Sequence, residues 1–113
     1  MTDINFTGMQ DMQKMLQEKY KDKWRALCPE IARDKLLWMI IEAGEAADII
    51  KKEGDRAIVN NGAVRHHFIE ELCDTLMYFN DVALCYGITP EEMSAVYIEK
   101  HEINMGRWSS EEA

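Results

Sequence analysis

The sequence has few residues that bend or crosslink a chain. It contains two prolines and six glycines in 113 residues, and its three cysteines form no Cys-x-x-Cys pair. So few turn residues argue against a loop-rich or many-stranded domain and favour a small number of long helices. The cysteine spacing supports neither a zinc site nor a secreted disulfide framework. We therefore interpret Cys73 and Cys85 as small residues of a helical core.

Basic charge and long apolar runs are also scarce. The chain has 13 basic against 21 acidic residues, a formal net charge of −8, so it lacks the basic face that non-specific binding to nucleic acid or anionic membranes requires. No apolar run approaches the roughly 20 residues that span a bilayer. The first residues do not resemble a signal sequence. We expect a cytoplasmic protein that binds neither nucleic acid nor membrane.

Hydrophobic periodicity predicts one all-α domain, residues 1–113, made of four helices in a bundle. Pro29 opens the second helix and Gly54 ends it. The segment Thr89-Pro90-Glu91-Glu92 is a capping box that opens the fourth. Residues 55–62 are expected to form a loop, and residues 109–113 a frayed tail. The expected helices cover about residues 6–24, 29–53, 63–86 and 90–105.

Two acid pairs lie inside apolar segments of the second and third expected helices. They are Glu42 with Glu45, and Glu71 with Asp74. A three-residue spacing puts both carboxylates of a pair on one helical face. Because a short connection joins these helices, we expect them to pack antiparallel. The two pairs can then face each other across the interface.

Four carboxylates within about 5 Å would repel one another by roughly 3 kcal/mol per pair at an effective dielectric constant of 20. A divalent cation offsets this repulsion, since Mg²⁺, or Mn²⁺ as a substitute, takes carboxylate ligands and keeps positions for water and phosphate oxygens. The alternative is that these acids form the solvated faces of two surface helices. His66 and His67 are interpreted as polar residues at a helix start, because the chain contains no Glu-x-x-His motif.

The order of these motifs resembles a known family. Glu42-x-x-Glu45, then Glu71-x-x-Asp74 followed by Tyr78, is similar to the metal-binding signature of the MazG-like, all-α nucleoside triphosphate pyrophosphohydrolases. Lys100-x-x-x-Asn104-x-x-Arg107-Trp108 is similar to that family's closing basic motif. The resemblance spans about residues 35–108. It departs at Ile41, where family members commonly carry an additional acid.

The resemblance implies a four-helix MazG-like unit and a Mg²⁺-dependent reaction. The implied activity is hydrolysis of a nucleoside triphosphate, a deoxy or non-standard one, to the monophosphate and pyrophosphate in nucleotide-pool housekeeping. The implied metal ligands are Glu42, Glu45, Glu71 and Asp74. Glu45 and Glu71 are the candidate catalytic residues, with Glu45 as the base that orients the attacking water.

Five further residues are candidates for binding the substrate. Arg107 and Lys100 would meet phosphate charge, the first through its planar fork and the second as a point charge. Asn104 would bond a phosphate or a base edge. Tyr78 follows Asp74 by one turn, and Trp38 precedes Glu42 by one turn, so either ring would border the nucleotide; each is also compatible with a core position.

Two alternative functions stay open. The same fold and metal suit phosphoribosyl-ATP, whose pyrophosphohydrolases belong to the same superfamily. A non-catalytic helical protein would instead use the acid face to bind divalent cations or a partner.

We also expect an oligomer. The second helix is apolar around most of its circumference from Leu36 to Ile41, and one layer of four helices would leave part of it exposed. The related enzymes form dimers or tetramers, which agrees with this expectation.

Overall fold

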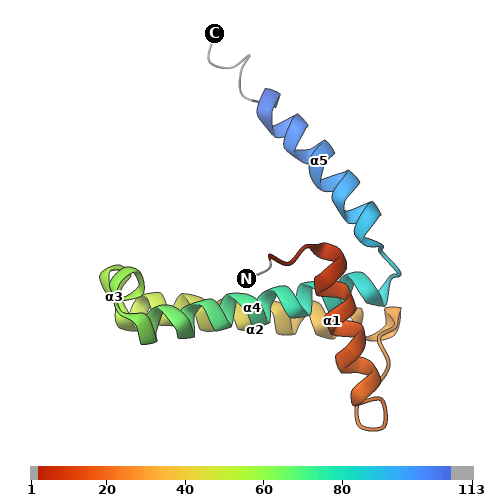
Figure 1. The fold of residues 1–113 in the computed structure, drawn as a ribbon, viewed down its shortest axis with the longest axis horizontal. Coiled ribbons are helices and arrows are strands. Elements are labelled where there is room, and N and C mark those ends of the chain that lie inside the picture. Colours follow the sequence, from red (N-terminus) through yellow and green to blue (C-terminus); the bar gives the residue numbers. More distant parts are fainter. Residues whose placement is uncertain (1–2, 108–113) are drawn as a thin grey trace.

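The computed structural model describes residues 3–107, which form five helices and no strand (Figure 1). The prediction of an all-α fold is confirmed. Trp108 and the predicted tail at residues 109–113 lie outside the described residues. The helices are α1 (Phe6–Lys19), α2 (Pro29–Glu53), α3 (Asp55–Asn60), α4 (Gly62–Cys85) and α5 (Pro90–Arg107).

Local signals at the helix ends behave as the sequence predicted. The backbone N–H of Glu92 donates to Thr89 Oγ1 at 3.1 Å, and the Thr89 N–H donates to Glu92 Oε1 at 3.3 Å, so the capping box is formed. Gly54 follows α2 with φ of 83°, and Gly87 follows α4 with φ of 65°. Both values lie in the left-handed region that glycine tolerates best.

Two predicted boundaries were wrong. The first helix ends at Lys19 rather than at Trp24, and a turn follows in which the Tyr20 and Trp24 rings lie 4.6 Å apart. Residues 55–60 form the short helix α3 instead of a loop, so the chain has five helices rather than four. The Asn61 side chain accepts from the N–H groups of Ala63 and Val64, so α4 starts directly after α3 and no loop separates the two helices.

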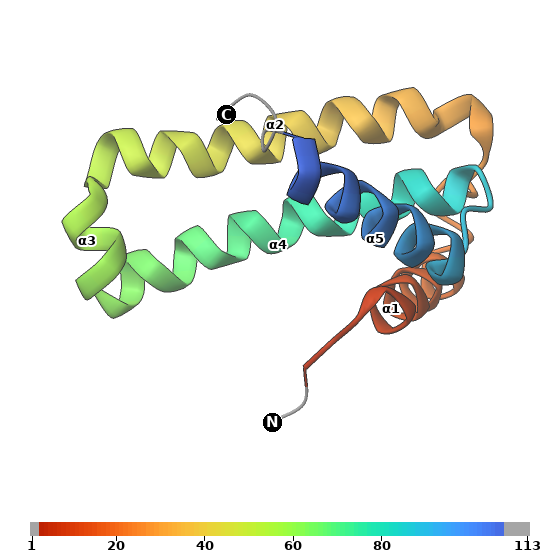
Figure 2. The same ribbon diagram turned by 90° about the horizontal axis from the view of Figure 1, so that it is seen from above.

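The two longest helices, α2 and α4, run antiparallel along each other and are joined at one end by α3 (Figures 1 and 2). We call this pair the α2–α4 hairpin. Helix α1 crosses α4 near the other end, where Gln10 Nε2 donates to the carbonyl of Ile88 at 3.0 Å. Helix α5 runs away from the hairpin (Figure 1). Near its start it meets α1, with the rings of Phe6 and Tyr97 6.3 Å apart.

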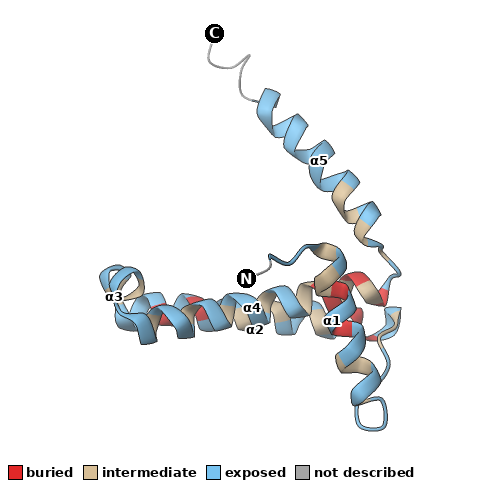
Figure 3. Cartoon of the chain, in the orientation of Figure 1, coloured by how far each residue is buried: buried red, intermediate tan, exposed pale blue. Residues whose placement is uncertain are grey.

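Most of the buried residues gather where α1 crosses α4 beside the start of α2, while Ala46 and Ile49 are buried further along α2 (Figure 3). We call the region of this crossing the junction. Its apolar part includes Ile31, Ala32 and Cys85, so the prediction that Cys85 is a core residue is confirmed. Cys73 is exposed instead, because it lies in the middle of α4, beyond the reach of α1.

The chain leaves much more surface in water than a closed bundle of its size. Its radius of gyration is 17.2 Å, against roughly 13 Å for a compact domain of this length. Its accessible surface is 8804 Å², against roughly 6,400 Å² for a folded monomer of this mass. Many large apolar side chains of the hairpin and α5 are exposed. No helix among the described residues is long and apolar enough to cross a membrane.

Candidate metal centre and adjoining cavity

Three of the four predicted acids come together across the hairpin. Glu42 on α2 and Glu71 and Asp74 on α4 each place one carboxylate oxygen within 4.8 Å of the others. The antiparallel packing of the two helices produces this convergence, as the sequence predicted. Glu45 lies one turn further along α2, is exposed and does not belong to the group. We call Glu42, Glu71 and Asp74 the acid group.

Burial and neighbouring carboxylates make the ionised forms of Glu42 and Asp74 less favourable, so the pKa values of both are raised. A hydrogen bond with Glu71 raises the pKa of Glu42 most, and burial and the charge of Asp74 raise it further. Burial raises the pKa of Asp74, as does the charge of Glu71. Oε2 of Glu71 is buried and has no hydrogen-bond partner. A divalent cation fits this donor set, because it would neutralise the carboxylates and give the unpartnered oxygen a ligand role.

His67 contacts the acid group from the preceding turn of α4. Its Nε2 lies 3.3 Å from Glu71 Oε1, so it restrains the carboxylate whose other oxygen is unpartnered. The four-residue spacing of His67 and Glu71 places both side chains on one face of a helix, which is the sequence signal for this contact. Asp48 lies further along α2, outside the acid group, and its Oδ2 forms an ion pair with Lys52 Nζ at 2.9 Å.

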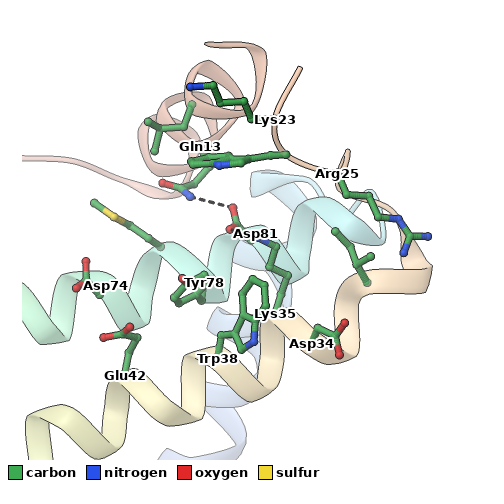
Figure 4. Close-up of a pocket in the computed structure, with 14 residues that line it drawn as sticks. Gln13, Lys23, Arg25, Asp34, Lys35, Trp38, Glu42, Asp74, Tyr78 and Asp81 are labelled. Carbon is green, nitrogen blue, oxygen red and sulfur yellow. Dashed lines mark hydrogen bonds and ion pairs between the residues drawn. The ribbon is translucent and has the colours of Figure 1, made fainter. Parts of the chain in front are cut away.

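A cavity of about 680 Å³ begins at the acid group and extends toward the junction (Figure 4). Glu42 and Asp74 line one end of it, and Trp38 and Tyr78 follow along the two helices. The rings of Trp38 and Tyr78 meet edge to face, with their centroids 5.8 Å apart. Burial and the charge of Glu42 raise the pKa of the Tyr78 hydroxyl. Both predicted aromatic residues therefore lie beside the acid group.

A polar network that the sequence did not predict lines the cavity further toward the junction. Asp81 Oδ1 accepts from Gln13 Nε2 at 2.9 Å, and Asp81 Oδ2 lies 3.7 Å from Lys35 Nζ. Burial raises the pKa of Asp81, while the Gln13 hydrogen bond and the Lys35 charge lower it. Asp81 follows Asp74 by seven residues and Lys35 precedes Glu42 by seven. Two helical turns therefore separate this network from the acids on both helices.

The predicted phosphate-binding residues lie elsewhere. Lys100, Asn104 and Arg107 are exposed on the part of α5 that runs away from the hairpin (Figure 1). Within one chain they are not brought to the acid group. The closing motif and the acid motifs therefore occupy separate parts of the structure.

The chain was compared with protein-family models, curated proteins and solved structures, and none of them matches it. The resemblance to MazG-like enzymes stays a prediction from the motifs.

Proposed function

We propose that the protein hydrolyses a nucleoside triphosphate, a deoxy or non-standard one, to its monophosphate and pyrophosphate with the help of Mg²⁺. The observation that carries this proposal is the acid group with its buried unpartnered oxygen, two members of which, Glu42 and Asp74, line one end of a cavity bordered by two aromatic rings. A polyphosphate is repelled by a group of carboxylates unless a cation lies between them. Three converging carboxylates are the donor set that Mg²⁺ or Mn²⁺ prefers.

In this proposal Glu42, Glu71 and Asp74 hold the cation, and His67 restrains Glu71. When bound, the cation would supply positive charge that offsets the negative charge developing on the phosphates during hydrolysis. Glu45, one turn from the acid group and exposed to water, orients the attacking water as a general base.

We propose further that the protein works as a homodimer or homotetramer in a MazG-like bundle completed by a second copy. The surface excess over a folded monomer of this mass is roughly 2,400 Å², which is as much as one partner contributes to a large obligate interface. Ile40 and Ile41, each 57% exposed, belong to the exposed apolar surface of α2 that a second copy would cover. Lys100, Asn104 and Arg107 on the protruding α5 would then meet the phosphates bound by a neighbouring copy.

The test is a panel of ribo- and deoxynucleoside triphosphates, together with phosphoribosyl-ATP, assayed with Mg²⁺ and with Mn²⁺. We expect release of pyrophosphate and a monophosphate from at least one compound, and no release of single phosphate. Glu71→Gln should lower turnover at least about 100-fold, because it removes a metal ligand. The protein should remain folded, since the substitution also removes like-charge repulsion.

The matched control is Glu70→Gln, which removes the same charge from the neighbouring residue of α4. The Glu70 side chain is mostly exposed and points to His66 rather than into the acid group, so turnover should stay near that of the wild type. Preferential turnover of phosphoribosyl-ATP would identify the first alternative. Cation binding without hydrolysis of any compound would identify the non-catalytic one and contradict the proposal.

A further inference from the structure

The network of Gln13, Lys35 and Asp81 lacks a role in holding phosphates or a cation. Asp81 is 3% exposed, yet it lines the cavity and its Oδ2 has Lys35 as a partner only at 3.7 Å. Figure 4 shows Trp38 and Tyr78 between this network and the acids Glu42 and Asp74. Gln13 holds Oδ1 at 2.9 Å, but the longer Lys35 contact leaves Oδ2 able to accept a further hydrogen bond, which a ligand in the cavity can donate.

We infer that the cavity binds the base of the nucleotide, and that Asp81, Lys35 and Gln13 contact the polar edge of that base. The inference rests on the proposed function, because it assumes that the acid group receives the phosphates through a cation.

The dimensions of the cavity suit this arrangement. Asp81 and Lys35 each lie two helical turns, roughly 10 Å, from the nearest acid on their own helix. A sugar and a base span a distance of that order. The cavity volume of about 680 Å³ lies in the middle of the range for sites that bind small molecules.

The chemistry of the walls suits a planar heterocycle. Aromatic side chains, Trp38 and Tyr78 from the hairpin and Trp24 from the turn after α1, line the cavity, and flat rings stack on such surfaces. Beyond the rings, the Asp81 carboxylate can accept an N–H, and the Lys35 ammonium can donate to a ring nitrogen or carbonyl. A base edge presents this combination of a donor next to an acceptor.

The opposite orientation, with phosphates at the junction end, is disfavoured by the charges there. The charge of the Lys35 ammonium is already balanced by the Asp81 carboxylate. Its Nζ also lies 4.9 Å from the Trp38 ring centroid and 5.6 Å from that of Tyr78. Lys23 and Arg25, the other bases lining the cavity, are exposed and lie at its outer rim (Figure 4). The phosphates therefore belong at the acid group.

The experiment compares kcat/KM for the deoxynucleoside triphosphates of four bases and for inorganic triphosphate, which has no base. Asp81→Asn should change the ratio between the best and the worst base by about tenfold, the value of one or two hydrogen bonds. Its KM for inorganic triphosphate should equal that of the wild type. Asp11→Asn, an exposed aspartate on α1, is the control and should leave the base ratios unchanged.

If Asp81→Asn does not fold, Gln13→Met provides the same readout of base ratios. Trp38→Leu provides a second readout: Trp38 is 45% exposed, so its replacement should leave the fold intact and lower kcat/KM for every nucleotide relative to inorganic triphosphate. Unchanged base ratios in the folded Asp81 or Gln13 variant, or a Trp38→Leu variant that keeps the wild-type ratio of nucleotides to inorganic triphosphate, would overturn the inference. A rise in the KM of inorganic triphosphate in Lys23→Ala or Arg25→Ala, with no change in the base ratios, would show the opposite orientation and also overturn it.

A binding measurement separates this inference from the proposed function. Nucleoside monophosphates are titrated into metal-free protein while tryptophan fluorescence is followed. If the protein hydrolyses no triphosphate but binds nucleoside monophosphates, and this binding weakens in Asp81→Asn, the base site is supported and the pyrophosphohydrolase activity is contradicted. Hydrolysis with base ratios that Asp81→Asn does not change would support the enzyme and contradict the base site.

Discussion

The junction and the middle of the hairpin are built in opposite ways, although the same two helices run through both. At the junction, Leu27 and Cys28 from the segment before α2 pack against Ile31, Ala32 and Cys85, and Gln13 of α1 donates to the buried Asp81. In the middle, large apolar side chains such as Ile40 and Ile41 are exposed, and three carboxylates crowd together. Each region has one buried side-chain oxygen without a hydrogen-bond partner, Asn80 Oδ1 at the junction and Glu71 Oε2 in the middle, but only the middle combines it with like charges and an exposed apolar surface.

This difference shows which parts of the molecule depend on something outside the chain. Buried polar groups are normally satisfied, and large apolar patches on a monomer mark binding surfaces. The middle of the hairpin departs from both rules, at Glu71 Oε2 and along the face that includes Ile40 and Ile41. A bound cation would give Glu71 Oε2 a ligand, and a second protein surface would cover the exposed apolar side chains. The comparison is tested by adding the cation, by removing its ligands and by placing a charge on the apolar surface.

The largest expected effect is that of the cation on stability. At a concentration 100 times its Kd, Mg²⁺ or Mn²⁺ should stabilise the folded protein by about 2.7 kcal/mol. For a domain of this size that raises Tm by about 10 °C. Thermal melting with and without the cation measures the shift.

Two variants locate the ligands in that experiment. Asp74→Asn should lose most of the Tm shift, and Glu45→Gln should keep most of it, because Glu45 lies outside the acid group. An equal loss in both would add Glu45 to the ligands and show that the group rearranges when the cation binds. No shift in the wild type with either cation would contradict the metal centre.

The next effect concerns the apolar face. Ile41→Asp puts a charge at a site that the proposed interface would desolvate, and it should weaken association by about 2 kcal/mol or more. Sedimentation velocity at micromolar concentration should show an oligomer for the wild type and a smaller species for the variant.

Val59→Asp is the matched control, since Val59 is equally exposed but lies on α3 at the far end of the hairpin. It should sediment like the wild type. A wild-type protein that is monomeric at these concentrations would contradict the proposed assembly.

The smallest effect is the pH dependence of the metal-free protein. Because the folded-state pKa values of Glu42 and Asp74 are raised, the folded chain binds more protons than the unfolded chain between the ordinary and the raised values. Stability should therefore fall as pH rises from about 4 through the raised pKa values, where these carboxyls lose their protons. Solvent screening keeps the change small.

Urea unfolding at a series of pH values, with a chelator present, measures this dependence. Glu71→Gln should flatten it, because the variant removes the group that contributes to both raised pKa values. A metal-free protein that gains stability between pH 4.5 and 7 would contradict the description of the acid group as repulsive. With a saturating cation the sign should reverse, since protons then compete with the cation.

The sequence was informative wherever a signal is local. The capping box at Thr89 and the glycine stop at Gly54 follow from side chains within a few residues of each other, and both are present. The convergence of Glu42 with Glu71 and Asp74 was also accessible, because three-residue spacing and one short connection between two helices leave little choice of geometry.

The sequence was uninformative where partners lie far apart in the chain. Asp81 binds Gln13 across 68 residues, and no spacing rule links them, so this network in the cavity wall was missed. The exposure of Cys73 had the same cause, since periodicity shows that a helix has an apolar face but not what covers it. The end of α1 at Lys19 was missed because the apolar series continues into the following turn.

The sequence by itself determined that the chain is helical, where most helices begin and end, and that acids share helical faces, because hydrogen bonding and side-chain spacing within a helix are local. Only the tertiary structure decided that α1 crosses one end of the hairpin, that α5 leaves it, and that Glu45 lies outside the acid group while Asp81 lines the cavity. Those outcomes depend on which surfaces of distant segments pack together, and that is a property of the whole chain.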